Sequence, residues 1–372
     1  MRLSDLGLRP GRLDRGPANA ITDVPGVRVG QAATRQGGSA VGVTAIVPYG
    51  AAPRPVATGL YAVDGGGGMT SLGVVEDFGT ASAPVVLASA AAVGAAYEAL
   101  IDLGLSVDAG LPVGAGWPPL VVPVDDAVTS DPAVQHNLAR PALVHAALAA
   151  AATSAPAEGA VGIGAGLAAF GGRGGVGTAS RRAAGGQAVV GALVAVNGGE
   201  PTSLSVDGVP VGAHLRAPPL PASAARTFAA ALVTDAPLMP RQLDRLAGRA
   251  VLGLARLGLY DADTREGLVL AQSTTGLVSE TAGATPAPTG VAAPGAARPL
   301  KEAGLERVGL AGEDDLPGLF RAAAEACEEA ALNGLVAAAA AGPAVARDGR
   351  HLPPLPLDGW PAAVRRLRPQ EG

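Results

Sequence analysis

Short apolar segments separated by turn-forming residues dominate the first part of the chain. Segments rich in β-branched residues and bounded by Gly, Pro or small residues are typical of strands. Three fit this pattern: Gly26–Gly30, Val41–Val47 and Ala83–Ala88. Directly after the third, apolar residues recur at helical spacing from Ala90 to Leu103, and Gly104 provides a helix stop signal. A second helix is expected over residues 141–152.

Further apolar segments in the second part of the chain predict central strands of a sheet. They are Gly159–Gly164, Ala188–Val196, Arg226–Val233 and Leu268–Gln272. A strongly periodic helix is expected between the last two. Thr234 or Asp235 can cap it, and Pro237 suits its first turn.

The final predicted helix runs from Leu316 to Ala341 and has a broad apolar face. Three acidic residues, Glu325, Glu328 and Glu329, are assigned to its polar side. Because strands and helices come in blocks along the chain, the pattern favours a layered α+β sandwich over a doubly wound fold. The stretch 281–299, rich in Ala, Pro, Gly and Thr, is expected to be a loop.

Composition supports a globular protein, although Gly and Pro are abundant. The 372 residues include 54 Gly and 32 Pro, but 48% are hydrophobic and only 16% are charged. Disordered chains carry far less apolar surface than this. The length allows two or three domains, or one large layered domain.

Charge and cysteine content exclude several classes of function. The formal net charge is −5, and Lys301 is the only lysine among 27 basic residues, so no basic stripe for nucleic acid is present. The single cysteine, Cys327, excludes an internal disulfide and a Cys-cluster metal site, and it is assigned a structural role. No secretory signal is evident, and the most apolar window, Ala83–Tyr97, is too short to cross a bilayer. A soluble cytoplasmic protein that binds no membrane is expected.

Familiar catalytic motifs are missing from the sequence. The glycine clusters Asp64–Gly68 and Gly171–Gly177 do not fit a phosphate-binding loop and are interpreted as tight turns and close strand packing. The four histidines have no metal-ligand spacing, and no Gly-x-Ser-x-Gly elbow accompanies them. Thr227, at the start of a predicted central strand, remains as a candidate, although a Thr there is usually only a strand residue.

Five motifs, in the right order, together resemble one family. They are Ala20-Ile-Thr-Asp-Val-Pro-Gly-Val-Arg-Val-Gly-Gln31, Gly175-Val-Gly-Thr-Ala-Ser-Arg181, Val206-Asp-Gly-Val-Pro-Val-Gly212, Thr234-Asp-Ala-Pro-Leu238, and Glu328-Glu-Ala followed by Asn333. They look like those of the DmpA-like L-aminopeptidase/D-esterase family, which includes β-aminopeptidases and nylon-oligomer hydrolases. The resemblance covers nearly the whole chain, from about Leu3 to Leu357.

The resemblance implies a four-layer αββα sandwich and a chain that cuts itself before a Ser or Thr. The nucleophile of the family corresponds here to Thr227, so cleavage is implied between Arg226 and Thr227. The two pieces, 1–226 and 227–372, would remain parts of one structural domain. A freed α-amine, with a pKa of roughly 7.7–8.0, can act as general base for its own hydroxyl, which removes the need for histidine.

Other site residues are carried over from the family by position. Asn197, in Val194-Ala-Val-Asn-Gly-Gly199, corresponds to the residue that stabilises the oxyanion, whereas a strand-end Asn-Gly is otherwise often a simple turn. Two residues that orient the amine and hydroxyl map by ungapped counting to Arg265 and Gly267, which would be inert. A slide of one residue gives Thr264 and Glu266, and this alignment is preferred.

The substrate-binding segments depart from the family pattern. Residues 111–120 lack the acid that in relatives receives the substrate amine, and only Trp117 can replace the aromatic ring there. The leading hypothesis is a self-processing hydrolase of peptide, amide or ester bonds that needs no metal or organic cofactor. The resemblance also implies a homo-oligomer, a tetramer or larger. The alternative is a degenerate relative that binds a small molecule or a partner without turnover.

Overall fold

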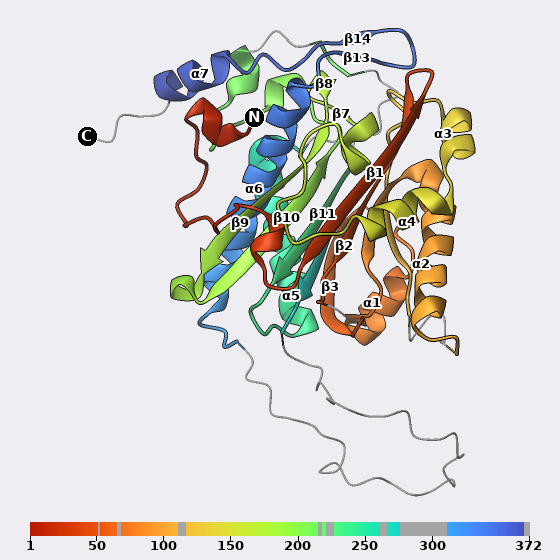
Figure 1. The fold of residues 1–372 in the computed structure, drawn as a ribbon. Coiled ribbons are helices and arrows are strands. Elements are labelled where there is room, and N and C mark those ends of the chain that lie inside the picture. Colours follow the sequence, from red (N-terminus) through yellow and green to blue (C-terminus); the bar gives the residue numbers. More distant parts are fainter. Residues whose placement is uncertain are drawn as a thin grey trace, which may run out of the picture.

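Two stacked sheets, covered by helices on both outer faces, form the molecule (Figure 1). The computed structural model describes residues 1–50, 53–64, 68–110, 117–214, 218–220, 227–260, 266–275 and 311–367. The expected loop over 281–299 lies outside the described residues, as do Arg226 and Thr264.

The smaller sheet has four strands in the order β1-β2-β5-β6. Their bounds are Arg28–Gln36 (β1), Ser39–Val47 (β2), Val85–Ser89 (β5) and Leu120–Val124 (β6). Every neighbouring pair is antiparallel except β5 and β6, which are parallel. All nine residues of β2 are buried, because sheet neighbours, helices and the second sheet surround this strand.

The larger sheet has six strands in the order β4-β3-β12-β11-β10-β9. Their bounds are Thr80–Ala81 (β4), Val56–Val63 (β3), Glu266–Ser273 (β12), Thr227–Thr234 (β11), Ala188–Val196 (β10) and Gly175–Ala183 (β9). The central pair β11 and β12 is parallel, and the other pairs are antiparallel. Every residue of β11 is buried, as its continuous apolar run predicts for a central strand.

The helices form the two outer layers. Their bounds are Leu72–Phe78 (α1), Val93–Val107 (α2), Pro132–Leu138 (α3), Pro141–Ala149 (α4), Pro240–Leu257 (α5), Leu316–Ala339 (α6) and Gly359–Leu367 (α7). One core cluster joins α2 and α4 to the smaller sheet, a second fills the space between the sheets, and a third joins α5 and α6 to the larger sheet. The four-layer αββα sandwich expected from the family resemblance is therefore confirmed.

Two short ribbons lie outside the main sheets, one formed by β7 and β8 and the other by β13 and β14. Their bounds are Ala168–Ala169 (β7), Gly172–Arg173 (β8), Ala344–Val345 (β13) and His351–Leu352 (β14). Within the described ranges, one helical stretch, Ala90–Val107, is long and apolar enough to cross a membrane by length and composition alone. In this structure it packs Ala96, Ala99 and Leu100 into the core beneath the smaller sheet.

Three expectations about local structure are wrong. Gly159–Gly164 is not a central strand: Gly159 forms an isolated bridge with Val176, and a 3₁₀ turn runs from Gly162 to Gly166. Gly162 has φ of +49°, a left-handed conformation that no strand residue adopts. The long periodic helix begins at Pro240 rather than next to Thr234, whose hydroxyl instead accepts a hydrogen bond from the Ala236 amide in the preceding turn.

The third wrong expectation concerns the acidic residues of α6, which are buried rather than solvated. Glu328 and Glu329 are fully buried and Glu325 nearly so, because α6 is covered by the larger sheet, by α5 and by the N-terminal segment. Arg181 of β9, also fully buried, lies 2.6 Å from Glu329 and 3.3 Å from Glu325. Glu325 and Glu329 thus belong to an internal ion-pair network, whereas Glu328 lies 3.4 Å from Arg256, whose side chain is about half exposed.

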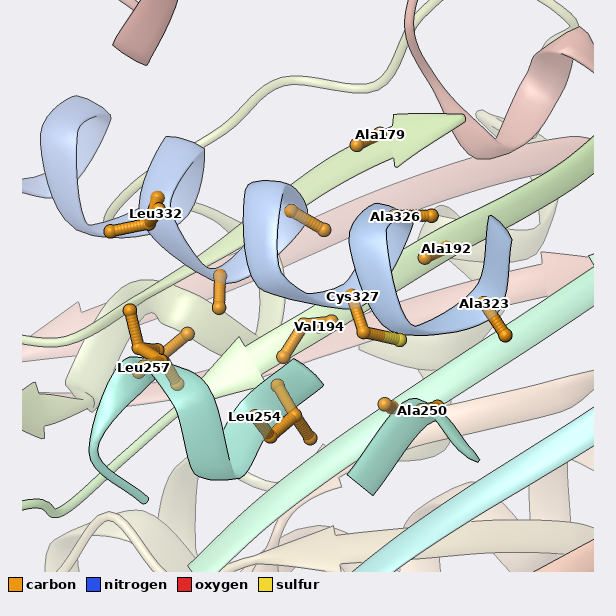
Figure 2. Close-up of a cluster of buried hydrophobic side chains, with 14 of the residues drawn as sticks. Ala179, Ala192, Val194, Ala250, Leu254, Leu257, Ala323, Ala326, Cys327 and Leu332 are labelled. Carbon is orange, nitrogen blue, oxygen red and sulfur yellow. The ribbon is translucent and has the colours of Figure 1, made fainter. Parts of the chain in front are cut away.

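Close contact between β9 and α6 depends on glycine. A Cβ placed on Gly177 would lie 2.1 Å from the Ala330 carbonyl oxygen and 2.3 Å from the Gly334 nitrogen. No real Cβ approaches that closely, so the interpretation of this glycine cluster as close packing is confirmed at Gly177. Cys327 points from α6 towards α5 among apolar side chains (Figure 2) and is fully buried, which raises the pKa of its thiol. This position agrees with the structural role expected for Cys327.

Candidate functional site

Thr227 and Asn197 meet at one edge of the larger sheet. Thr227 is the first residue of β11, and Asn197 directly follows the last residue of β10. These two strands are antiparallel, with Val196 opposite Phe228, so the end of one lies beside the start of the other. The Asn197 amide nitrogen Nδ2 lies 3.3 Å from the Thr227 hydroxyl oxygen Oγ1 and donates to it.

Two backbone contacts orient the Asn197 side chain. Its Oδ1 accepts a hydrogen bond from the Ala168 amide at 3.2 Å, and its Nδ2 donates to the Asp125 carbonyl oxygen at 2.7 Å. The first partner can only donate and the second can only accept, so the pair fixes which end of the amide carries the hydrogens. The amino end therefore faces Thr227.

Burial restricts water at both residues. Asn197 is 1% exposed and Thr227 is 7% exposed. In a site of low polarity, an oriented N–H group stabilises a developing negative charge more strongly than it does in water. A hydroxyl beside an oriented amide donor is the arrangement that acyl transfer requires of a nucleophile and an oxyanion donor.

Glu266 lies in register with Thr227 on the neighbouring strand. β11 and β12 are parallel, and the register pairs Thr227 with Glu266 and Phe228 with Gly267. The backbones of Asn197, Thr227 and Glu266 therefore lie in one row across three strands, spaced by about 4.8 Å per strand. The choice between the two alignments, Thr264 with Glu266 or Arg265 with Gly267, stays a prediction, because the register gives only the backbone positions of Glu266 and Gly267. Thr264 and the cleavage residue Arg226 lie outside the described residues.

Trp117 does not lie where a substrate-lining residue is expected. Its side chain is 2% exposed, and its indole Nε1 donates to the Leu100 carbonyl oxygen of α2 at 2.7 Å. The ring is therefore part of the packing between α2 and the smaller sheet. A tryptophan this buried is more typical of core packing than of a binding surface.

Sequence reasoning missed a pair of aspartates beside the site. Asp125 and Asp126 follow β6 directly, and the Asp125 carbonyl oxygen holds Asn197 as described above. Asp126 is 1% exposed, and burial raises the pKa of its carboxyl group to about 6, against hydrogen bonds from Ser89 and Gln135 that lower it. Two acidic residues directly after a buried strand were the available signal.

The described part of the chain contains no group of three or more His, Cys, Asp or Glu side chains arranged to hold a metal ion. His136 and His351 are exposed on the surface. His145 lies 3.4 Å from Asp102, and both side chains are about half exposed.

The chain is similar to known proteins over most of its length. Residues 19–349 match the model of peptidase family S58. The chain is 33% identical over 364 residues to the beta-peptidyl aminopeptidase BapA of Sphingosinicella microcystinivorans, covering 91% of this chain and 86% of that protein.

Solved structures show the same fold over the whole length. A beta-aminopeptidase from a Burkholderia species superposes with a TM-score of 0.83 at 36% identity, covering 99% of both chains. An L-aminopeptidase D-Ala-esterase/amidase from Ochrobactrum anthropi superposes with a TM-score of 0.82 at 30% identity, covering 98% of both chains. The latter is described as a prototype for the serine aminopeptidases and a variant of the Ntn hydrolase fold.

Proposed function

The chain belongs to peptidase family S58 and is a hydrolase of the aminopeptidase type, and on this premise we propose that it processes itself and uses Thr227 as nucleophile. The observation that carries the proposal is the Asn197–Thr227 contact, in which an oriented amide N–H group meets a nearly buried hydroxyl. The relative from Ochrobactrum anthropi is described as a serine aminopeptidase, so a threonine in this role is a difference that the proposal must accommodate.

Self-processing follows from the chemistry of a hydroxyl next to a peptide bond. The Thr227 oxygen attacks the Arg226 carbonyl carbon, the C–N bond breaks, and an ester joins Arg226 to the Thr227 hydroxyl. The proton lost by the hydroxyl goes to the departing nitrogen, which becomes a free amine. Water then hydrolyses the ester, leaving Arg226 with a carboxylate and Thr227 with both its hydroxyl and its α-amine.

The same residue then acts on substrate. The free α-amine takes the hydroxyl proton as Thr227 Oγ1 attacks the substrate carbonyl carbon, and the Asn197 N–H group stabilises the oxyanion. The protonated amine passes its proton to the leaving nitrogen or oxygen, and water releases the acyl group from Thr227. Glu266, in register with Thr227, is proposed to orient the amine together with Thr264.

We propose that the substrates are small peptides, amides or esters, in keeping with the activities named for the relatives. The missing acid in residues 111–120 means that recognition of a free substrate amine must use another group. We also propose that the protein is cytoplasmic, forms a homo-oligomer and needs no cofactor.

Substitution of Thr227 tests the proposal. On a denaturing gel, the wild-type chain is expected to give two bands, and Thr227→Ala is expected to stay uncut and inactive. Thr227→Ser keeps the hydroxyl and is expected to restore both cleavage and hydrolysis of aminoacyl p-nitroanilides. Cleavage and turnover that persist in Thr227→Ala would refute the assignment. A folded wild-type chain that is cut but inactive would instead favour the non-catalytic alternative.

A further inference from the structure

A buried carboxyl group belongs to Asp126, the residue that follows the Asp125 carbonyl group to which Asn197 donates. Asp126 follows β6, and both of its carboxyl oxygens accept short hydrogen bonds. Ser89 Oγ, at the end of β5, donates to Oδ2 at 2.7 Å, and Gln135 Nε2, on α3, donates to Oδ1 at 2.7 Å. Asp126 thereby joins the end of the smaller sheet to a helix that covers it.

The two donors are themselves anchored to β2. The Gly42 amide donates to Ser89 Oγ at 3.0 Å, and Gln135 Nε2 also donates to the Ala40 carbonyl oxygen at 2.8 Å. Ser89 and Gln135 are both buried. The position of the Asp126 carboxyl group is therefore set by two strands and one helix rather than by a surface loop.

Asp126 is connected to the site through a single peptide bond. The carbonyl oxygen that accepts from Asn197 Nδ2 belongs to Asp125, and that peptide unit ends at the Asp126 nitrogen. A peptide unit is planar, so the Asp125 carbonyl group and the Asp126 N–H group turn together, and anchoring Asp126 limits how far that plane can turn. The direction of the carbonyl group in turn helps to orient the Asn197 amino group.

We propose that Asp126 is a positioning residue for the hydrolytic reaction, acting through the Asp125 carbonyl group to aim the Asn197 N–H group at the reacting oxygen. This inference rests on the proposed function, because it requires Asn197 to stabilise the oxyanion. A misplacement of about 1 Å in a catalytic group can cost about 100-fold in rate. The Asp126 carboxyl group is 1% exposed and bonded to Ser89 and Gln135, so the role assigned to it is positioning rather than direct catalysis.

The direct test is Asp126→Ala in the full chain. The substitution leaves a cavity in place of the carboxyl group and removes the acceptor of Ser89 Oγ and Gln135 Nε2. We expect the Asp125–Asp126 peptide unit to tilt as a result. We expect kcat, measured per processed chain with an aminoacyl p-nitroanilide, to fall about 10- to 100-fold while KM changes less than about threefold. Asp126→Asn is expected to restore kcat to within a few-fold. Its amide oxygen can accept from Gln135, and its amino group can donate to the rotatable Ser89 hydroxyl.

A double-mutant cycle separates positioning from general stability. If Asp126 acts through Asn197, adding Asp126→Ala to Asn197→Ala is expected to lower kcat by less than about threefold further, because the two effects are coupled. Thr44→Val is the matched control. Thr44 is a fully buried residue of β2 whose hydroxyl accepts from the Ile163 amide. Its effect on kcat is expected to be the same in both backgrounds.

Three outcomes distinguish the positioning role of Asp126 from the proposed function of Thr227 and Asn197. The positioning role would be overturned if Asp126→Ala kept the wild-type kcat. It would also be overturned if the losses in kcat of Asp126→Ala and Asn197→Ala multiplied fully in the double variant. Either result would leave the proposed function intact. Wild-type activity in both Thr227→Ala and Asn197→Ala would overturn the proposed function and this inference with it. A coupled loss of kcat rescued by Asp126→Asn supports the positioning role.

Discussion

Replacing Asn197 with alanine separates catalysis from stability at the site. The substitution removes the amide donor that lies 3.3 Å from Thr227 Oγ1. Losing one such donor typically costs about 10²–10³ in kcat, or about 2.7–4 kcal/mol of transition-state stabilisation. The proposed self-cleavage also passes through an oxyanion, on the Arg226 carbonyl, so processing of the Asn197→Ala chain is expected to slow as well.

The folded state also loses hydrogen bonds. Asn197 accepts from the buried Ala168 amide and donates to the Asp125 carbonyl group, which is only part-buried. A buried polar group left without a partner costs about 1–3 kcal/mol, so Asn197→Ala is expected to lower the free energy of unfolding by about 1–3 kcal/mol. Activity therefore has to be compared per folded, processed chain.

Thr234→Ala is a matched control for this measurement. Thr234 is fully buried at the opposite end of β11, where its hydroxyl donates to the Val189 carbonyl oxygen and accepts from the Ala236 amide. It therefore also leaves two backbone groups unpaired. Urea unfolding is expected to show a comparable loss of stability in the two variants, whereas only Asn197→Ala is expected to lose kcat.

Two results would refute the reasoning about Asn197. A kcat within about threefold of wild type in processed Asn197→Ala would exclude it as an oxyanion donor, since removal of such a donor costs about 10²–10³. Equal losses of kcat in Thr234→Ala and Asn197→Ala would show that the effect comes from general loosening of β11.

The remaining predictions concern α6 and its neighbours. Gly177→Ala is expected to displace α6 and lower Tm, because the new Cβ would lie 2.1 Å from a backbone oxygen. Gly94→Ala is the control: in helix α2 its Cβ would have nothing within 4 Å, so it is expected to stabilise the fold by up to about 1 kcal/mol. Equal Tm values in the two variants would contradict the close packing at Gly177. Arg181→Met removes the fully buried partner of Glu329, which keeps Arg15 at 2.6 Å, and is expected to lower the free energy of unfolding by about 1.5–3 kcal/mol; a neutral effect in urea unfolding would show that the pair contributes no net stability. Burial raises the pKa of Glu328 from 4.5 to about 7, so the folded state holds that proton more tightly and stability falls as the pH rises from about 5 through 7, by about 3 kcal/mol. Glu328→Gln is expected to reduce this dependence between pH 5 and 8 without abolishing it, because the pKa of the buried Asp126 carboxyl is also raised, to about 6; an unchanged slope would contradict the raised pKa of Glu328.

The layered fold could be predicted because its central elements have unambiguous local patterns. The bounds of β10 coincide with the predicted segment, and β11 and β12 begin and end within a few residues of expectation. The strands β3, β6 and β9 were not predicted. β9 contains polar residues that long-range contacts satisfy: the Thr178 hydroxyl donates to the Ala192 carbonyl oxygen, and Arg181 pairs with acids of α6.

Tertiary contacts explain the largest error. Periodicity assigns Glu325, Glu328 and Glu329 to the solvent, because acidic side chains are rarely buried without partners. Their partners come from distant segments, including Arg181 and the Leu13 amide, which donates to Glu325. No local pattern connects residues so far apart in the sequence.

The candidate site could be predicted only in part. Thr227 and Asn197 were found by resemblance, and their contact depends on the antiparallel register of β10 and β11, which no short motif encodes. Asp125 and Asp126 were missed, since two aspartates after a strand are usually a solvated turn. The contact between Asp125 and Asn197 depends on the end of β6, in the smaller sheet, lying beside the end of β10, in the larger sheet.

The central claim is that Thr227 becomes an N-terminal nucleophile, and the identity of the mature N-termini tests it most directly. Intact-mass measurement and N-terminal sequencing of the purified, folded protein are expected to give two pieces of 226 and 146 residues, the second beginning with Thr227. An intact 372-residue chain that hydrolyses aminoacyl substrates, or a second piece that begins at another residue, would contradict the account.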